Sequence, residues 1–184
     1  MTAVGLGTAP TASAQAPSCP WMDTTKTPEA RAQALLNAST LDQKLRWLDE
    51  QSANDPTNPN AGGRPLPVQV PCTPFIAYAD GPTAVVAGTG VTAFPSQTTL
   101  AATFDQDLAR RKGKAQGYEA FHKRRNVLLA PGLSTARTPI AGRTSEYLGE
   151  DPLLSGLMAA SIVKGFGDNP SEPVESVLKH WVAN

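Results

Sequence analysis

The stretch "NVLLAP" (126–131) most constrains the fold, because it is a continuous apolar run of strand length. Such runs are typical of strands buried on both faces, as in parallel sheets, whereas a half-exposed strand alternates apolar and polar residues. Two further short strands are predicted within "PFIAYADGP" (74–82) and "VESVLKHW" (174–181). The chain therefore offers three candidate strands for one buried sheet.

Helices are predicted between these strands. Residues 105–124 fit a helix, although Gly113 and Gly117 weaken it. Asp151-Pro152 begins another that runs to about Phe166, with the aspartate as N-cap and proline in the first helical position. The order strand, helix, strand, helix, strand predicts an α/β fold with parallel strands and crossover helices.

The remaining segments give weaker signals. Thr27-Pro28-Glu29 opens one helix, and residues 39–43 begin a second with Leu41, Leu45 and Leu48 on one face. Three segments show no regular pattern and are interpreted as loops or irregular structure, namely residues 52–66, 83–99 and 132–150.

Composition excludes several classes of partner. The 184 residues are enough for one domain with a core, and 16 basic side chains balance 16 acidic ones. No basic stripe points to nucleic acid or an anionic membrane, and no apolar run approaches the ~20 residues that cross a bilayer. The only histidines, His122 and His180, lack metal-ligand spacing, so we expect no metal and no cofactor.

The N-terminus indicates export. Residues 1–16 are small and weakly apolar and end in Ala14-Gln15-Ala16, a signal-peptidase type of site. We interpret them as a signal-peptide remnant of a secreted or periplasmic protein, the alternative being a disordered terminus. In an exported protein Cys19 and Cys72 would pair and tie the N-terminal segment to the residues before the first strand, whereas in the cytosol they would be buried thiols.

Polar residues follow each predicted strand. They are Asp80 after the first strand, Arg143 and Glu146 in the loop after the second, and Lys179-His180 after the third. Because carboxyl ends of parallel strands meet at one edge, these side chains should converge on a site for a polar small molecule.

Each of these residues also has a simpler interpretation. Asp80 precedes Gly-Pro, which favours a turn aspartate whose carboxylate accepts backbone N–H groups. Arg143 is either a solvated charge or a bidentate clamp, and Glu146 could bond to it and hold the loop. Asp151 is explained as a helix cap, with Glu150 beside the positive helix end.

Lys179 and His180 are neighbours on a predicted strand, so a regular strand would point them in opposite directions. Both reach one ligand only if the backbone departs from strand geometry, and we therefore predict a strained or cis peptide bond between them. The alternative is a lysine at the mouth of the site with the histidine packed behind the sheet.

Several stretches together resemble the family-3 glycoside hydrolases of the bacterial β-glucosidase type. The resemblance extends in order over nearly all of residues 19–184 and is strongest in "APGL…ARTP…GR…EYLGEDP" followed by "KH…AN". The matching segments are "CPWMD", "LDQKLRWL", "YADGP", "TAFPSQTTLAATFDQDLA", "NVLLAPGLSTARTPIAGRTSEYLGEDPLLSGLMAA" and "LKHWVAN".

The resemblance implies a (β/α)8 TIM-barrel domain and retaining hydrolysis of a small or oligosaccharide β-glycoside. Asp80, Arg143, Lys179 and His180 resemble the residues that bind sugar hydroxyls in subsite −1 of that family. Trp181 and the residues after it, in place of a Pro-Gly-His segment, resemble the glucosidase or xylosidase branch more than the hexosaminidase branch.

The family's nucleophilic aspartate and acid/base glutamate lie beyond the position that matches Asn184. A full barrel takes ~250 residues, so residues 17–184 are interpreted as an incomplete N-terminal barrel domain without catalytic residues. We expect such a chain to be inactive alone. The alternative function is a non-catalytic sugar-binding remnant.

Overall fold

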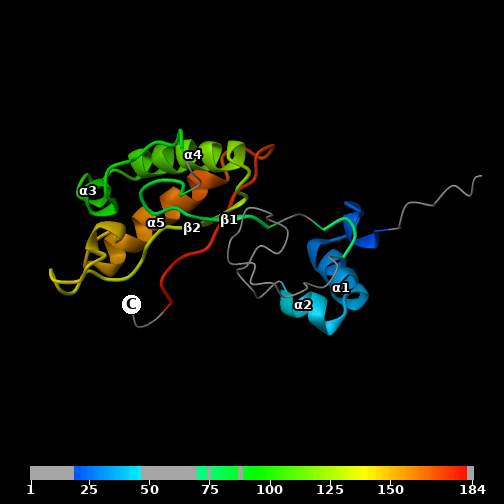
Figure 1. The fold of residues 1–184 in the computed structure, drawn as a ribbon. Helices are drawn as coiled ribbons and strands as arrows, with labels where there is room; N and C mark the ends of the chain where they lie inside the picture. The colour runs from blue at the N-terminus through cyan, green and yellow to red at the C-terminus, as the bar shows by residue number, and fades with distance from the viewer. Residues whose placement is uncertain (1–18, 47–69, 74–75, 87–88, 182–184) are drawn as a thin grey trace, which may run out of the picture. The chain divides into compact units, whose positions relative to one another are not determined.

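The computed structural model describes residues 19–46, 70–73, 76–86 and 89–181. These residues divide into two compact units (Figure 1). The first contains residues 19–46 and 70–73, and the second contains the rest of the described chain. The segment 1–16, the predicted loop at 52–66 and Leu48 lie outside the described residues.

The first unit begins with a short 3-10 helix, η1 (Pro20–Met22), followed by the helices α1 (Pro28–Ala38) and α2 (Leu41–Arg46). Both predicted helix starts are confirmed. Oγ1 of Thr27 accepts a hydrogen bond from the N–H of Ala30 at 3.3 Å. At α2, the N–H of Thr40 donates to Oε1 of Gln43 at 2.9 Å and the N–H of Gln43 donates to Oγ1 of Thr40 at 3.2 Å, which is a capping box.

Few side chains are buried in the first unit, and other bonds hold it together. No residue of α1 is buried, and Leu41 is 69% exposed. Cys19 and Cys72 form a disulfide, as expected for the exported case. Beside it, Nε1 of Trp21 donates to the carbonyl of Pro71 at 3.2 Å, and Nε of Arg31 donates to the carbonyl of Trp21 at 2.7 Å.

The second unit contains the predicted parallel sheet. Its strands are β1 (Tyr78–Asp80), β2 (Val127–Leu129) and β3 (Glu175–Ser176), in the order β1-β2-β3 with both pairs parallel. All three strands are shorter than the sequence suggests, and β3 has only two residues. The alternating strand and helix order is confirmed.

Two long helices cross between the strands, α4 (Gln106–His122) and α5 (Pro152–Phe166). They lie side by side in Figure 1 and pack on each other. Each begins at an aspartate N-cap. The Asp105 carboxylate accepts the N–H of Leu108 at 2.8 Å, and Asp151 accepts two N–H groups at 2.7 and 3.0 Å. The capping role predicted for Asp151 is therefore confirmed.

Gly113 of α4 and Gly165 of α5 have a packing role that the sequence did not reveal. A Cβ atom on Gly113 would lie 2.2 Å from the carbonyl oxygen of Ile162 in α5, and one on Gly165 would lie 2.2 Å from that of Arg110 in α4. Glycine weakens a helix in isolation, but here it lets two helix backbones approach closely.

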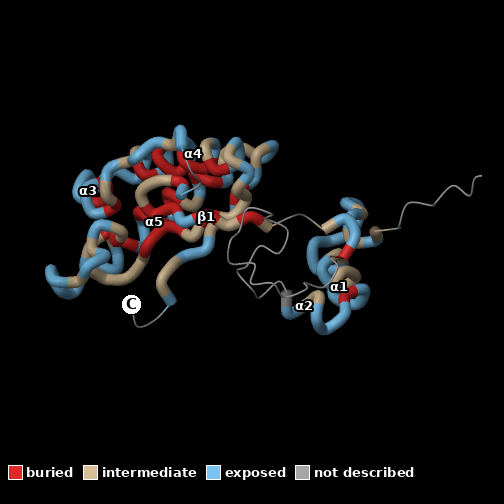
Figure 2. The backbone as a smooth tube through the Cα atoms, viewed as in Figure 1, coloured by how far each residue is buried: buried red, intermediate tan, exposed pale blue. Residues whose placement is uncertain are grey.

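The core of the second unit lies where these helices meet the sheet, and Figure 2 shows its buried residues gathered there. Leu128 of β2 and Met158 and Ile162 of α5 are fully buried. The apolar run at 126–131 therefore supplies the central strand, as predicted.

One predicted irregular segment is wrong in part. The segment 83–99 was expected to be irregular, but its end belongs to a helix, α3 (Gln97–Ala101). Ser96 is the N-cap of α3, and its side chain accepts the N–H of Thr99 at 3.2 Å. A serine cap after a proline was the available signal. The loop at 132–150 also contains a short 3-10 helix, η2 (Thr144–Glu146).

Candidate functional site

The carboxyl ends of the strands bring the predicted site residues together. Asp80 is the last residue of β1, and Lys179 lies three residues beyond β3. Gly132, beyond β2, forms isolated parallel bridges to both Tyr147 and Lys179. The N–H of Leu133 also donates to the carbonyl of Lys179 at 2.6 Å. The loop from β2 is thus bound on one side to Tyr147, directly after η2, and on the other to the segment after β3.

Asp80 and Lys179 form an ion pair across this edge, between residues 99 positions apart in the chain. The Lys179 side chain is 13% exposed, whereas the Asp80 side chain keeps 54% of its surface exposed. The sequence favoured a turn aspartate that binds backbone N–H groups, and this interpretation is wrong, because the carboxylate binds a distant ammonium group. A ligand can still reach the exposed carboxylate.

Arg143 and Glu146 form a second, bidentate pair, as predicted for Glu146. Nε of Arg143 donates to Oε1 at 2.7 Å and Nη2 donates to Oε2 at 2.8 Å. The hydrogen bonds from the guanidinium lower the pKa of Glu146, with smaller contributions from Lys179 and His180, and Glu146 in turn raises the pKa of Arg143. Both side chains therefore carry their charges at neutral pH.

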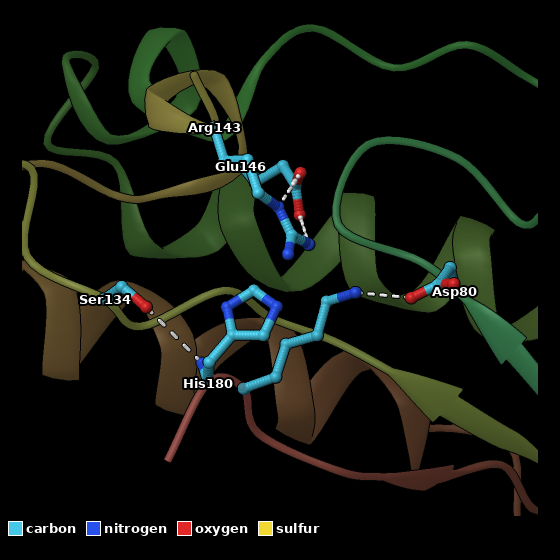
Figure 3. A network of polar contacts seen from close by, with 6 residues as sticks. Asp80, Ser134, Arg143, Glu146 and His180 are labelled. Atoms are coloured by element: carbon cyan, nitrogen blue, oxygen red, sulfur yellow. Dashed lines mark hydrogen bonds and ion pairs between the residues drawn. The ribbon is translucent and has the colours of Figure 1, made fainter. Parts of the chain in front are cut away.

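The peptide bond between Lys179 and His180 is cis, as the sequence predicted for two neighbours that reach one site. The His180 ring meets the Tyr147 ring edge-on, with centroids 6.4 Å apart. Its backbone N–H lies 3.5 Å from Oγ of Ser134. Figure 3 shows the imidazole pointing toward the Arg143–Glu146 pair. The alternative, a histidine packed behind the sheet, is therefore wrong.

The imidazole of His180 is neutral at neutral pH. Burial lowers its pKa first, and the positive charges of Arg143 and Lys179 lower it further, against smaller opposite effects of Glu146 and Asp80. Its Nδ1 atom is buried and has no hydrogen-bond partner within the part of the chain that the structure describes. A neutral imidazole carries one donor and one acceptor.

Three contributors to the site were missed from the sequence. The Ser134 hydroxyl accepts the backbone N–H of His180, and the Tyr147 ring lies edge-on to the His180 ring. Thr98 of α3 donates to the carbonyl of Tyr147 at 2.9 Å and to that of Thr144 at 3.1 Å. The unpredicted helix α3 thus holds the loop that carries the Arg143–Glu146 pair.

The described residues contain neither a metal-binding cluster nor a membrane-spanning helix. Residues 19–46, 70–73, 76–86 and 89–181 contain no group of three or more histidine, cysteine, aspartate or glutamate side chains that could hold a metal ion. Among the helices of the same ranges, none is both long and apolar enough to cross a membrane.

Known proteins are similar to this chain in sequence. The family model described as the glycosyl hydrolase family 3 N-terminal domain matches residues 68–184. A β-glucosidase of Bacteroides ovatus, BoGH3A, is 33% identical over an alignment of 178 positions that covers 89% of this chain and 22% of that protein. Thermostable β-glucosidase B of Acetivibrio thermocellus is 43% identical over 93 residues, or 50% of this chain and 12% of that protein.

Solved structures share the fold as well. β-Glucosidase 3B of Thermotoga neapolitana, in complex with α-D-glucose, matches with a TM-score of 0.54 at 40% identity, over 60% of this chain and 16% of that one. DesR, a β-glucosidase of Streptomyces venezuelae in complex with D-glucose, matches with a TM-score of 0.54 at 32% identity, over 59% and 14%.

Parallel strands, crossover helices and a polar cluster at the strand ends define an α/β protein of the partial-barrel class. The chain belongs to glycosyl hydrolase family 3, whose N-terminal domain model matches its last 117 residues, from 68 to 184. It spans about a fifth or less of the length of these curated relatives.

Proposed function

We propose that this chain supplies sugar-binding residues of a β-glucosidase-like glycoside hydrolase, with retaining hydrolysis of a β-glycoside as the reaction of the whole enzyme. The observation that carries the proposal is the gathering of Asp80, Arg143, Glu146, Lys179 and His180 at the carboxyl ends of parallel strands. In the subsite that we propose, Asp80, Arg143, Lys179 and His180 bind hydroxyl groups, and Glu146 holds Arg143.

The charges of the cluster fit a neutral polyhydroxylated ligand. Two basic and two acidic side chains form two ion pairs, and the neutral His180 adds a donor and an acceptor. Such a site offers many hydrogen-bonding groups with no net charge. A phosphate or carboxylate ligand would instead be expected to meet an excess of basic groups.

The same arrangement supports binding rather than proton transfer. A glycosidase acid must hold its proton near neutral pH, which requires a raised pKa. Arg143 lowers the pKa of Glu146, and Asp80 is bound to Lys179. We therefore propose that the acid/base group lies outside this chain, as the family resemblance also implies for the nucleophile, and that the chain alone turns over no glycoside.

Titration calorimetry with D-glucose on the 184-residue chain tests the proposal. We expect saturable binding that weakens at least tenfold in Asp80→Asn, because the neutral amide loses both the ion pair and the charge-assisted bonds to hydroxyls. Asp107→Asn is the matched control, since Asp107 is an exposed acid on α4 of the same unit. It should leave the affinity unchanged.

An aryl β-glucoside assay on the same samples completes the test. Absence of glucose binding in the wild-type chain would contradict the sugar-binding role. Hydrolysis by the purified chain, retained in repeated preparations, would contradict the assignment of the catalytic groups to residues outside it. Binding without hydrolysis agrees both with the proposal and with a non-catalytic sugar-binding protein. A chain extended by further segments of the family distinguishes the two, because only the proposal expects the extended chain to hydrolyse the glucoside.

A further inference from the structure

A lysine and a glutamine lie in the interior of the second unit, one turn apart on α4. Lys112 is 7% exposed and Gln116 is fully buried. Lysine is almost never buried without partners, because its ammonium group loses hydration there. The partners of these two side chains therefore indicate what the pair does.

Both side chains bind the turn that follows β1. Nζ of Lys112 donates to the carbonyl oxygen of Pro82 at 2.9 Å and also to Oε1 of Gln116. Nε2 of Gln116 donates to the carbonyl oxygen of Gly81. One connected network, anchored on α4, thus holds the two carbonyl groups that come directly after Asp80.

Other elements enclose this turn. The carbonyl of Asp80 accepts the N–H of Val86 at 2.9 Å. A Cβ atom on Gly81 would lie 3.1 Å from Cδ2 of Leu128 in β2, so the turn also lies close against the central strand. The ammonium group of Lys112 further lies 5.6 Å from the centroid of the Phe94 ring, at cation–π distance.

We propose that Lys112 and Gln116 are positioning residues that fix the Asp80 carboxylate for ligand binding by holding the backbone immediately after it. They act through the carbonyls of Gly81 and Pro82 and not on the carboxylate itself. The proposal rests on the sugar-binding role proposed above for Asp80. An apolar pair of similar size would fill the same space without fixing these carbonyls.

The positioning role does not require Lys112 to be charged. Burial lowers its pKa to about 7, so both protonation states occur at neutral pH. The ammonium form has three donors and the neutral amine has two, so both can serve Pro82 and Gln116. Removing the amine by substitution is therefore a clearer test than changing the pH.

The test compares Lys112→Met, which keeps the aliphatic stem, with Lys123→Met. Lys123 is the matched control, because its Nζ also donates to a carbonyl of the β1–α3 connection, that of Thr89 at 2.7 Å, but away from the turn at 81–82. In the full 184-residue chain, NMR follows the carboxyl carbon signal of Asp80 and the hydrogen exchange of the Val86 amide. The Val177 amide, which donates to Leu128 at 2.8 Å in the sheet, reports on unfolding of the whole unit.

We expect Lys112→Met to move the Asp80 signal, to speed Val86 exchange at least tenfold relative to Val177, and to weaken D-glucose binding at least fivefold. Lys123→Met should leave all three within twofold. A merely structural lysine would speed the exchange of Val86 and Val177 equally and leave the Asp80 signal in place in the folded chain, which would overturn the proposal.

Two further outcomes are distinguishable. If the wild-type chain does not bind D-glucose, the sugar-binding function fails, and the Asp80 signal and Val86 exchange still decide whether Lys112 positions Asp80. If Lys112→Met does not fold, Gln116→Leu tests the half of the network at Gly81 with the same measurements. An unchanged Asp80 signal and unchanged Val86 exchange in that variant would overturn the proposal.

Discussion

The two units are stabilised by different means. In the first, α1 buries no residue, and a disulfide and a few hydrogen bonds to Trp21 and Pro71 connect its segments. In the second, a continuous apolar cluster joins α4 and α5 to the sheet. Small units bury too little surface to be stable by packing alone, and a covalent bond compensates. The candidate site lies in the unit whose geometry is fixed by its core.

The largest expected effect follows from removing the disulfide. Cys19→Ser/Cys72→Ser opens a link across 53 positions, and loss of that constraint on the unfolded chain should destabilise the first unit by roughly 4 kcal/mol. Hydrogen exchange should show lost protection in α1 and unchanged protection in α4 and α5. Equal loss in both units would contradict the comparison. Because disulfides persist in oxidising compartments, we also propose that the chain is exported, and non-reducing electrophoresis of the protein from its natural source should then show the Cys19–Cys72 bond.

The next effect concerns the packing of the second unit. Gly165→Ala places a Cβ atom 2.2 Å from the carbonyl of Arg110, so α4 and α5 must separate, at a cost of roughly 1–3 kcal/mol in the free energy of unfolding. Gly156→Ala in the same helix is the control. A Cβ atom at position 156 would meet nothing within 4 Å. Because alanine favours the helix more than glycine does, this variant should stabilise the unit by roughly 0.5–1 kcal/mol. Chemical denaturation followed at the α5 amides measures both, and destabilisation by both variants would show that helix contact is not the cause.

The sequence predicted the parts of the fold that depend on local signals. Asp151 before Pro152 marks a helix start because the N-cap bond spans only two or three residues, and the structure places α5 at that position. The strand ends were less accurate, because pairing depends on neighbouring strands that a single segment does not reveal. The helix α3 was missed because its five residues give too short a pattern for periodicity to detect.

The charged residues of the candidate site were predictable, but the ion pair between Asp80 and Lys179 was not. Topology alone places Asp80 and Lys179 at one edge of a parallel sheet. The ion pair between them joins residues 99 positions apart, so no local pattern could distinguish it from a turn aspartate. The buried position of Lys112 was missed because a local expectation was misleading. A lysine in a predicted helix is expected on the solvated face, whereas Lys112 binds the carbonyl of Pro82 in the interior.

The smallest effect compares one acid in each unit. The hydrogen bonds from Thr25 lower the pKa of Asp23 in the first unit, and those from Arg110 lower the pKa of Asp168 in the second. A carboxylate with a lowered pKa stabilises the folded state above its unfolded pKa of about 3.9, and this stabilisation is lost as the pH falls through the folded value. Both acids should therefore titrate below ordinary aspartates in NMR titrations of their carboxyl carbons.

Added salt should separate the two acids. The bond that dominates at Asp23 comes from a neutral hydroxyl, at 2.6 Å, whereas Asp168 binds a guanidinium through Nη2 at 2.6 Å and Nε at 3.0 Å. Salt screens charges at exposed pairs and leaves hydrogen bonds from neutral donors nearly unchanged. Raising the salt concentration from about 0.05 to about 1 M shortens the electrostatic screening length severalfold. Over this range, the pKa of Asp168 should rise toward the ordinary value more than that of Asp23. Asp168→Asn should accordingly lower the stability of the second unit at neutral pH and low salt, and this difference should disappear in acid. A salt response of the same size at Asp23 would show that Lys26 and Arg31, and not Thr25, dominate its environment.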